Sequence, residues 1–288
     1  MRLRQVCNES GLNHYMGIAI SAFVATIIAW ASTLLPAEWT STPWHPLLAC
    51  ALFIVPGVPL INFVDDMLDN YIQVGIVRAV NTLLMVAAMA FGIAFAVKLC
   101  HIENFFPTIS MVPHHQYWEY AIAAAISAMG FSMIFNIQRR LLWVVAIGGI
   151  IAVCTRNFVN LGPSTDNIGL DMGLVIGSFS GAVLVSLIAI KAVHWFHVPN
   201  HVLTIPSVIP MIPGVLMYRM LFGIININVQ SIDQVTPLMK AIESGVNSGL
   251  VIMCIALGVA IPNIFGRRFI ASSKNKRCLL YTSPSPRD

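Results

Sequence analysis

Long apolar runs separated by short polar links dominate the sequence, and they limit its possible folds more than any other feature. Hydrophobic residues make up 57% of the 288 residues and charged residues only 10%, whereas an average soluble domain is roughly 25% charged. A soluble fold of this size would need far more charge to cover its surface. The composition therefore predicts an all-α, polytopic helix bundle in a lipid bilayer. It excludes most soluble enzymes, and the short basic clusters do not form a nucleic-acid-binding surface.

Eight segments approach the length that a membrane-spanning helix needs, which is about 20 apolar residues. The predicted spans are residues 15–35, 46–64, 74–97, 119–136, 141–155, 168–190, 202–224 and 243–265. Most Lys and Arg, among them Arg78, Arg139, Arg140 and Lys191, then fall on the same side as both termini. Because Lys and Arg are enriched on the cytoplasmic side of membrane proteins, we expect a multi-pass protein with both termini in the cytoplasm.

Matching residues recur in the two halves of the chain at a nearly constant separation. The matches are Gly17, Ser21 and Ala25 with Gly173, Gly177 and Gly181; Pro56–Gly57 with Pro213–Gly214; and Asn81 and Gly92 with Asn247 and Gly258. The first repeat would cross the membrane in the opposite direction to the second. Inverted repeats with interrupted helices are typical of secondary transporters. We therefore expect a partial first repeat in residues 1–110 and a second in residues 111–277.

The ends of the chain carry two further expectations. The second repeat has five predicted helices and the first has three, which predicts that helices upstream of Met1 are missing. Residues 278–288 read CLLYTSPSPRD, which is the one-frame translation of a common sequencing-library adapter. We interpret these residues as an artefact, leave them out of the fold, and expect the natural C-terminus to be absent.

Two predicted spans contain Pro–Gly pairs. Proline lacks a backbone donor and clashes with the preceding helical turn, so Pro56–Gly57 and Pro213–Gly214 are expected to break the spans at 46–64 and 202–224. Irregular backbone at membrane depth is tolerated mainly where it lines a cavity or is buried in protein. We therefore predict that substrate binds between the two broken helices, near these four residues. Packing kinks without ligand contact are the alternative.

Few charged side chains are placed to act on a substrate or a proton. Asp66 follows the first break and is a candidate for substrate binding and proton coupling, with a solvated loop acid as the alternative. Asp171, within the predicted span 168–190, is a second proton-coupling candidate, because an acid inside a span usually faces a cavity or a partner. Arg156 with Asn157 can hold a carboxylate, since guanidinium binds carboxylates in a bidentate manner. An interfacial anchor is the alternative for this pair.

The sequence predicts neither a metal site nor a cofactor. His194, His197 and His201 are close in sequence, but Pro199 interrupts their helical spacing. We interpret them, with Trp195, as part of an interfacial belt. No nucleotide-binding P-loop is present in the sequence.

Two stretches resemble the threonine/serine exporter family. FIVPGVPLINFVDDMLDNYIQVGIVRAVNTLL resembles the end of its first membrane domain, and HVLTIPSVIPMIPGVLMYRMLFG resembles the signature of its second. The resemblance covers nearly all of residues 1–277 and places the family's Asp at Asp66 and its Arg at Arg78. It implies proton-driven efflux of threonine and serine, as small-molecule substrates, across the bacterial inner membrane. Export of dicarboxylates such as succinate, and a non-transporting assembly or sensor subunit, remain alternatives. Association with further copies of the chain is left open.

Overall fold

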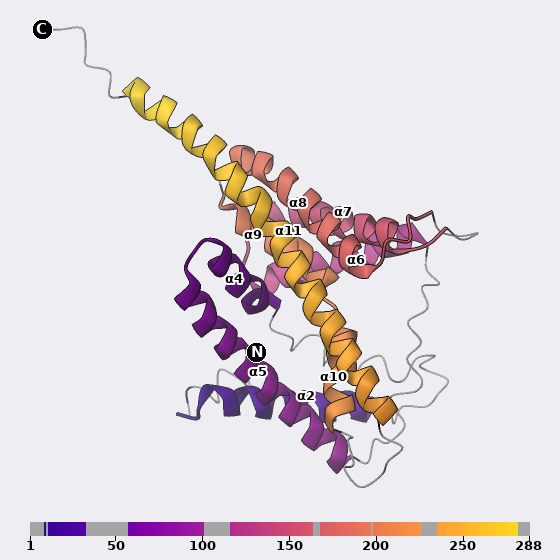
Figure 1. Ribbon diagram of the computed structural model, residues 1–288. Helices are drawn as coiled ribbons and strands as arrows, with labels where there is room; N and C mark the ends of the chain where they lie inside the picture. Colours follow the sequence, from indigo (N-terminus) through magenta and orange to yellow (C-terminus); the bar gives the residue numbers. More distant parts are fainter. Residues whose placement is uncertain are drawn as a thin grey trace, which may run out of the picture. The chain divides into compact units, whose positions relative to one another are not determined.

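Helices make up every regular element in the described part of the chain (Figure 1). The computed structural model describes residues 9, 11–32, 57–100, 116–163, 168–196, 198–225 and 235–281. Its elements are α2 (His14–Ser32), α4 (Gly57–Leu68), α5 (Ile72–Leu99), α6 (Tyr117–Ile134), the 3-10 turn η1 (Arg139–Leu141), α7 (Leu142–Asn160), α8 (Leu174–Phe196), α9 (Asn200–Val208), the 3-10 turn η2 (Ile209–Met211), α10 (Gly214–Ile225) and α11 (Val235–Tyr281). The all-α prediction is confirmed.

Five helices contain a segment that is long and apolar enough to cross a bilayer. These segments are His14–Ala31, Ile72–Leu99, Arg139–Asn160, Leu174–Val193 and Leu238–Gly266. Large apolar side chains on them stay exposed, such as Phe91 at 70% and Trp143 at 72%, as expected where helices face lipid tails. The chain is therefore a multi-pass helical membrane protein. The other three predicted spans correspond to α6, which has 18 residues, and to the helices that carry the Pro–Gly pairs, so the count of eight stays a prediction.

The described residues form two compact units. The first holds α2, the start of α4, α5, α10 and the start of α11; the second holds the end of α4, α6 to η2 and the rest of α11. These units group residues by contact and do not test the predicted repeat boundary at residue 110.

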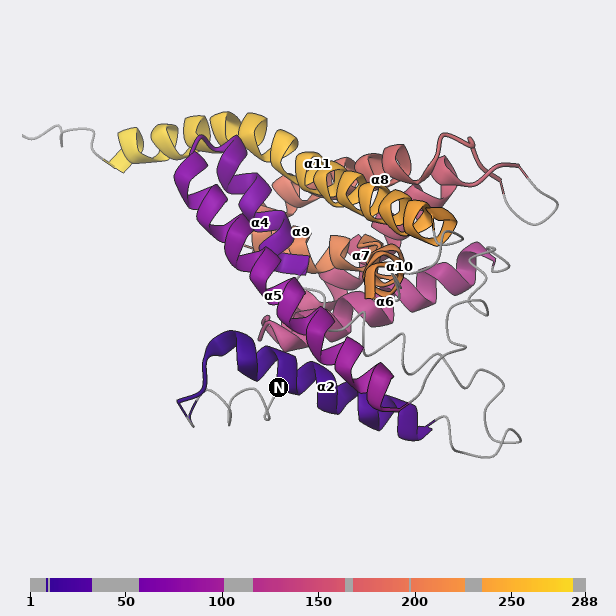
Figure 2. The ribbon, with the colours of Figure 1, turned by 60° about the horizontal axis from the view of Figure 1, so that its bottom comes forward.

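In the first unit, α2 packs along α5 (Figure 2). The shared core includes Ile18, Ala22, Met85 and Met89. Gly92 brings the two backbones close together, because a Cβ there would overlap the Ala19 carbonyl oxygen and lie 3.1 Å from the Ala22 Cβ. Near the start of α2, the Tyr15 hydroxyl donates a hydrogen bond to Asn81 Oδ1 at 2.7 Å.

In the second unit, α7 packs against α6, α8 and α9. Small residues again set the close approach: a Cβ at Gly149 would lie 2.7 Å from the Ala128 Cβ on α6. Gly258 on α11 packs against α8, where a Cβ would lie 2.8 Å from the Ala182 Cβ and 2.9 Å from the Phe179 carbonyl oxygen. Gly92 and Gly258, which match in the sequence repeat, thus both lie where two helices approach closely, α5 with α2 and α11 with α8. The repeat and its inverted arrangement stay predictions.

The helix predicted at 168–190 begins later than expected. Its start at residue 168 was wrong, since α8 begins at Leu174 and residues 168–173 fold back along the end of α7. The amides of Leu170, Asp171 and Met172 donate to the carbonyl oxygens of Phe158, Leu161 and Val159 at 2.9–3.0 Å. Carbonyls at a helix end lack intrahelical partners, so this segment caps α7 instead of extending α8. Gly173, at φ +89, makes the turn into α8, and so it lies outside the helix that Gly177 and Gly181 share.

The second Pro–Gly break is confirmed. The predicted span 202–224 consists of α9, η2 and α10, with Ile212 and Pro213 outside any helix. Pro56 and the first half of the span 46–64 lie outside the described residues, and α4 begins at Gly57. The span predicted at 243–265 lies within α11, a helix of 47 residues or about 70 Å. The predicted artefact at 278–288 overlaps its last residues and stays a prediction.

We expect Gly92→Leu to destabilise the α2–α5 pair. The new side chain would meet the Ala19 backbone, which cannot move without shifting α2, and overpacking of this kind costs about 1–3 kcal/mol. The thermal midpoint in detergent should fall clearly below that of Gly130→Leu, because a Cβ at Gly130 has no neighbour within 4 Å. Equal midpoints for the two variants would contradict the close approach of α2 and α5.

Candidate functional site

The break between α9 and α10 leaves backbone carbonyls without helical donors. Prolines at 206, 210 and 213 each lack the N–H that a helix would direct at the carbonyl four residues earlier. The break places the carbonyl end of η2 at Met211, two residues before Pro213. The carbonyl end of a helix carries a partial negative charge. A cationic group is therefore favoured at this end of the α9–η2 segment.

Arg156 and Asn157, near the end of α7, meet this carbonyl end. The Arg156 Nη1 donates to the Met211 carbonyl oxygen at 3.5 Å. Its Nε and Nη2 donate to Asn157 Oδ1 at 3.2 and 3.1 Å. The sequence predicted Arg156 with Asn157 as one site and Pro213–Gly214 as another. The structure brings Arg156 to the Met211 carbonyl, two residues before Pro213.

Donor groups at this site remain unused. A guanidinium has five N–H donors, so the bonds to Asn157 and Met211 leave two of them. Asn157 is 4% exposed, and its Nδ2 is buried with no hydrogen-bond partner. Among the described residues no carboxylate forms an ion pair with Arg156. Because buried polar groups are normally hydrogen-bonded and buried charges paired, the site suits an anionic ligand.

Two glycines of α8 shape the site from the other side. A Cβ at Gly177 would lie 2.6 Å from the Arg156 carbonyl oxygen, and one at Gly181 would lie 2.6 Å from the Ala152 carbonyl oxygen and 3.0 Å from Met211 Sδ. These are the second and third glycines of the motif that starts at Gly173. The motif therefore brings α8 against α7 beside Arg156, a function that sequence spacing alone did not indicate.

The other predicted residues are placed as follows. Gly57 and Gly214 are buried and begin α4 and α10. Asp66 lies in the last turn of α4, where its carbonyl accepts the Tyr71 amide at 2.9 Å while Asn70 adopts φ 68. This is the usual left-handed end of a helix.

Asp171 is not inside a span. It lies before α8 and is exposed, with φ 53. Its amide caps Leu161, and its side chain makes no ion pair with Arg156. The prediction that Asp171 lies inside a span was wrong, because residues 168–173 cap the end of α7 and α8 begins only at Leu174. Proton coupling at Asp171 thus stays a prediction without the burial that motivated it.

The structure also shows a pair that sequence reasoning missed. Asp65, in the last turns of α4, lies with Oδ2 3.9 Å from Nε2 of His201 in the first turn of α9. The two side chains are 16% and 43% exposed. His201 had been assigned to an interfacial belt, and the side chains of His194 and His197 lie outside the described residues. The adjacency of Asp65 to Asp66 was the only sequence signal for this pair.

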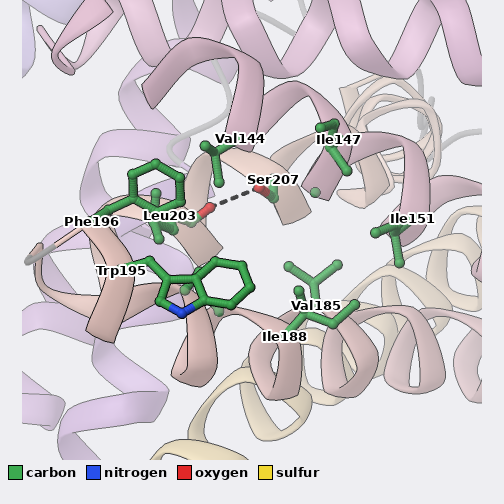
Figure 3. A pocket seen from close by; sticks show the side chains of 12 residues that line it. Val144, Ile147, Ile151, Val185, Ile188, Trp195, Phe196, Leu203 and Ser207 are labelled. Atoms are coloured by element: carbon green, nitrogen blue, oxygen red, sulfur yellow. Dashed lines mark hydrogen bonds between the residues drawn. The ribbon is translucent and has the colours of Figure 1, made fainter. Parts of the chain in front are cut away.

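A separate apolar pocket of about 240 Å³ opens between α7, α8 and α9 (Figure 3). Its labelled lining includes Ile147, Ile188 and Trp195, and its side-chain polar groups are the Ser207 hydroxyl and the Trp195 indole N–H. The Ser207 hydroxyl already donates to the Leu203 carbonyl oxygen at 2.7 Å. No charged side chain from the described part of the chain lines this pocket, so we place the candidate site at Arg156.

Comparison with known proteins agrees with the sequence resemblance. The family profile described as Threonine/Serine exporter, ThrE matches residues 120–265, and a second threonine/serine exporter profile matches residues 1–100. Over 99 residues the chain is 34% identical to the "Probable succinate transporter subunit YjjP" of Klebsiella aerogenes. It is 32% identical, again over 99 residues, to the protein of the same name in Escherichia coli K12.

These alignments cover 34% of this chain and 38% of each relative. The chain thus spans well under half the length of the curated relatives it matches. No solved structure matches it. The first profile alone covers more than half of the chain. The chain therefore belongs to the threonine/serine exporter family.

Proposed function

We propose that the chain is a secondary exporter that moves threonine and serine out of the cytoplasm across the bacterial inner membrane, driven by the proton motive force. Membership of its family indicates a membrane exporter and not an enzyme. The observation that carries the substrate class is the contact between the Arg156 guanidinium and the Met211 carbonyl.

This contact places a positive and a negative group side by side. In an α-amino acid the ammonium and the carboxylate are bonded to the same carbon, so groups that bind them must also be adjacent. The unused donors of Arg156 and Asn157 suit the carboxylate. The carbonyl end of η2 at Met211 suits the ammonium. A zwitterionic amino acid thus satisfies both halves of the site.

A dicarboxylate is the second candidate, because the relatives matched over 99 residues carry the name of a succinate transporter subunit. Its second carboxylate would need another cation. Between α6 and η2 the other described Lys and Arg residues are Arg139 and Arg140, about 25 Å from Arg156 along α7, and Lys191, which is exposed on α8. This part of the second unit therefore favours the amino acid. The same name, transporter subunit, supports assembly with a further chain.

The predicted topology, in which the end of the span 46–64 and the start of the span 202–224 lie on the same side of the membrane, also gains support. In that topology the link after residue 64 and the link before residue 202 both lie on the cytoplasmic side. Asp65 and His201, one from each link, are in contact. From that side, α9 and η2 extend about 18 Å, which would bring Met211 near the middle of a hydrocarbon core about 30 Å thick.

We test the substrate class by calorimetric titration of the protein, purified in detergent after expression from its complete gene. The ligands are threonine, threonine methyl ester, N-acetylthreonine and succinate. A hydrogen bond to a charged group contributes about 1.5–3 kcal/mol. Removing either charge should therefore weaken binding by about 10- to 100-fold, and succinate should bind more weakly than threonine.

If N-acetylthreonine binds as tightly as threonine, the Met211 carbonyl does not bind the ammonium group. Succinate that binds more tightly than threonine would favour the dicarboxylate candidate. Efflux of labelled threonine from loaded vesicles distinguishes an exporter from a non-transporting subunit. Threonine binding without efflux indicates a sensor or assembly subunit.

A further inference from the structure

We propose that Asp65 and His201 form a proton-operated latch on the cytoplasmic side of the exporter. Protonated His201 holds the first turn of α9 against the end of α4, and loss of the proton to the cytoplasm releases it. The inference rests on the proposed export function and adds to it the residues that couple protons to transport. Asp66 and Asp171 stay separate candidates for proton coupling.

The first support is the geometry of the pair. Nε2 of His201 and Oδ2 of Asp65 are 3.9 Å apart, and the side chain of Asp65 is only 16% exposed. A carboxylate in this setting attracts an imidazolium and has no such attraction to a neutral imidazole. Histidine is the side chain whose ordinary titration falls near neutral pH. Gain or loss of a proton on His201 therefore changes the strength of the contact.

The second support is that Asp65 is the charged group His201 contacts. Elements packed against α9 bring Glu119 and Tyr120 on α6, Arg156 on α7 and Lys191 on α8. Within the described ranges, none of these groups forms an ion pair or hydrogen bond with His201, and neither do Arg139 and Arg140 of η1. On α11, Arg267 and Arg268 follow Asn263 by about one turn, and their side chains lie outside the described residues. Asp66 and Asp69 lie within about one turn of Asp65, and their carboxylates add negative charge at this end of α4.

The third support is the position of the pair directly beside the two predicted spans that contain the Pro–Gly pairs, 46–64 and 202–224. Asp65 follows Gly57 on α4, and His201 precedes Pro213 on the α9–η2 segment. The amide of Asn200, beside His201, contacts the amide of Asn263 on α11. The start of α9 is thus held by α11 on one side and by Asp65 on the other. Only the second of these contacts depends on a proton.

The sign of the effect follows from the pair. At low pH His201 is charged, the pair forms and the cytoplasmic side is held closed. As pH rises through the histidine range the attraction is lost and the cytoplasmic side can open to load substrate. A state that binds protons more tightly is favoured when protons are abundant. Proton entry from outside and release to the cytoplasm would therefore drive the cycle in the export direction.

Proteoliposomes give the main test, with labelled threonine followed in two modes. At equal pH on both sides, His201→Gln and Asp65→Asn should still exchange internal for external threonine. Under an imposed pH gradient, the stimulation of transport should fall about tenfold in both variants, a typical size for coupling between two sites. His14→Gln is the matched control, since it changes a histidine at the start of α2 and should keep the stimulation.

A swapped pair, Asp65→His with His201→Asp, should restore part of the stimulation, which a purely structural loss would not allow. Normal stimulation in His201→Gln, with exchange intact, would overturn the latch.

Hydrogen exchange of the α9 backbone, measured against pH without substrate, separates the latch from the proposed function. Protection should fall with rising pH in the wild type and be independent of pH in Asp65→Asn. If threonine is not transported but this difference is present, the substrate assignment fails and the latch stands. If the wild type shows no pH dependence of protection, the latch is wrong whatever the substrate.

Discussion

Replacing Arg156 with alanine should abolish threonine export. Truncating one partner of a buried, hydrogen-bonded charge pair costs about 2–5 kcal/mol, which predicts a loss of threonine affinity of at least about 30-fold. Arg156→Lys keeps the charge but loses the planar fork that matches a carboxylate. Its threonine affinity should therefore fall between those of the wild type and Arg156→Ala. Calorimetric titration and efflux from loaded vesicles measure these effects.

The stability of the ligand-free protein distinguishes a binding role from a packing role. Arg156 has no described carboxylate partner, so its charge is left unpaired until a ligand arrives. Burying a charge without a paired partner costs free energy, and methionine at this position removes that cost. Arg156→Met should therefore keep or raise the thermal midpoint while losing threonine binding. Arg140→Ala is the control, because Arg140 is exposed and bonds only Gln138 among the described residues. A lower midpoint together with normal binding in Arg156→Met would assign Arg156 to structure alone.

Gly181→Leu should have the second largest effect on export. Its Cβ would lie 2.6 Å from the Ala152 carbonyl oxygen, which belongs to the α7 backbone, and 3.0 Å from Met211 Sδ. Either α8 moves away from α7, which removes its packing beside Arg156, or η2 is displaced, which separates the Met211 carbonyl from Arg156. Overpacking alone costs about 1–3 kcal/mol. We expect a lower thermal midpoint and threonine binding weakened by at least about tenfold.

Gly130→Leu is the matched control for this change, since it adds the same side chain to an open position on α6. Thermal unfolding and calorimetric titration in the same detergent compare the two. If Gly181→Leu binds threonine as the wild type does, the close approach of α8 to the α9–η2 end does not shape the site.

The sequence determined the class of the protein and most of its helices. Runs of apolar residues with few charges have one stable environment, which is the bilayer, so the membrane class and the positions of α2, α5 and α7 followed directly. The break before Gly214 was equally predictable, because proline lacks the amide that a helix requires. Hydropathy and the missing proline amide are local properties of the chain, so they determine these features without any contact between distant segments.

Tertiary structure alone decided which polar groups meet. Arg156 and Met211 are far apart in sequence, and no periodicity indicates that the guanidinium reaches this carbonyl. The same holds for Asp65 and His201. The start of α8 was misjudged for a related reason: residues 168–173 are apolar enough for a helix, but their amides cap the end of α7 instead. Contacts between distant segments depend on how closely helices approach. The approach of α8 to α7 is set at Gly177 and Gly181, where the absence of a side chain lets the two backbones come close together.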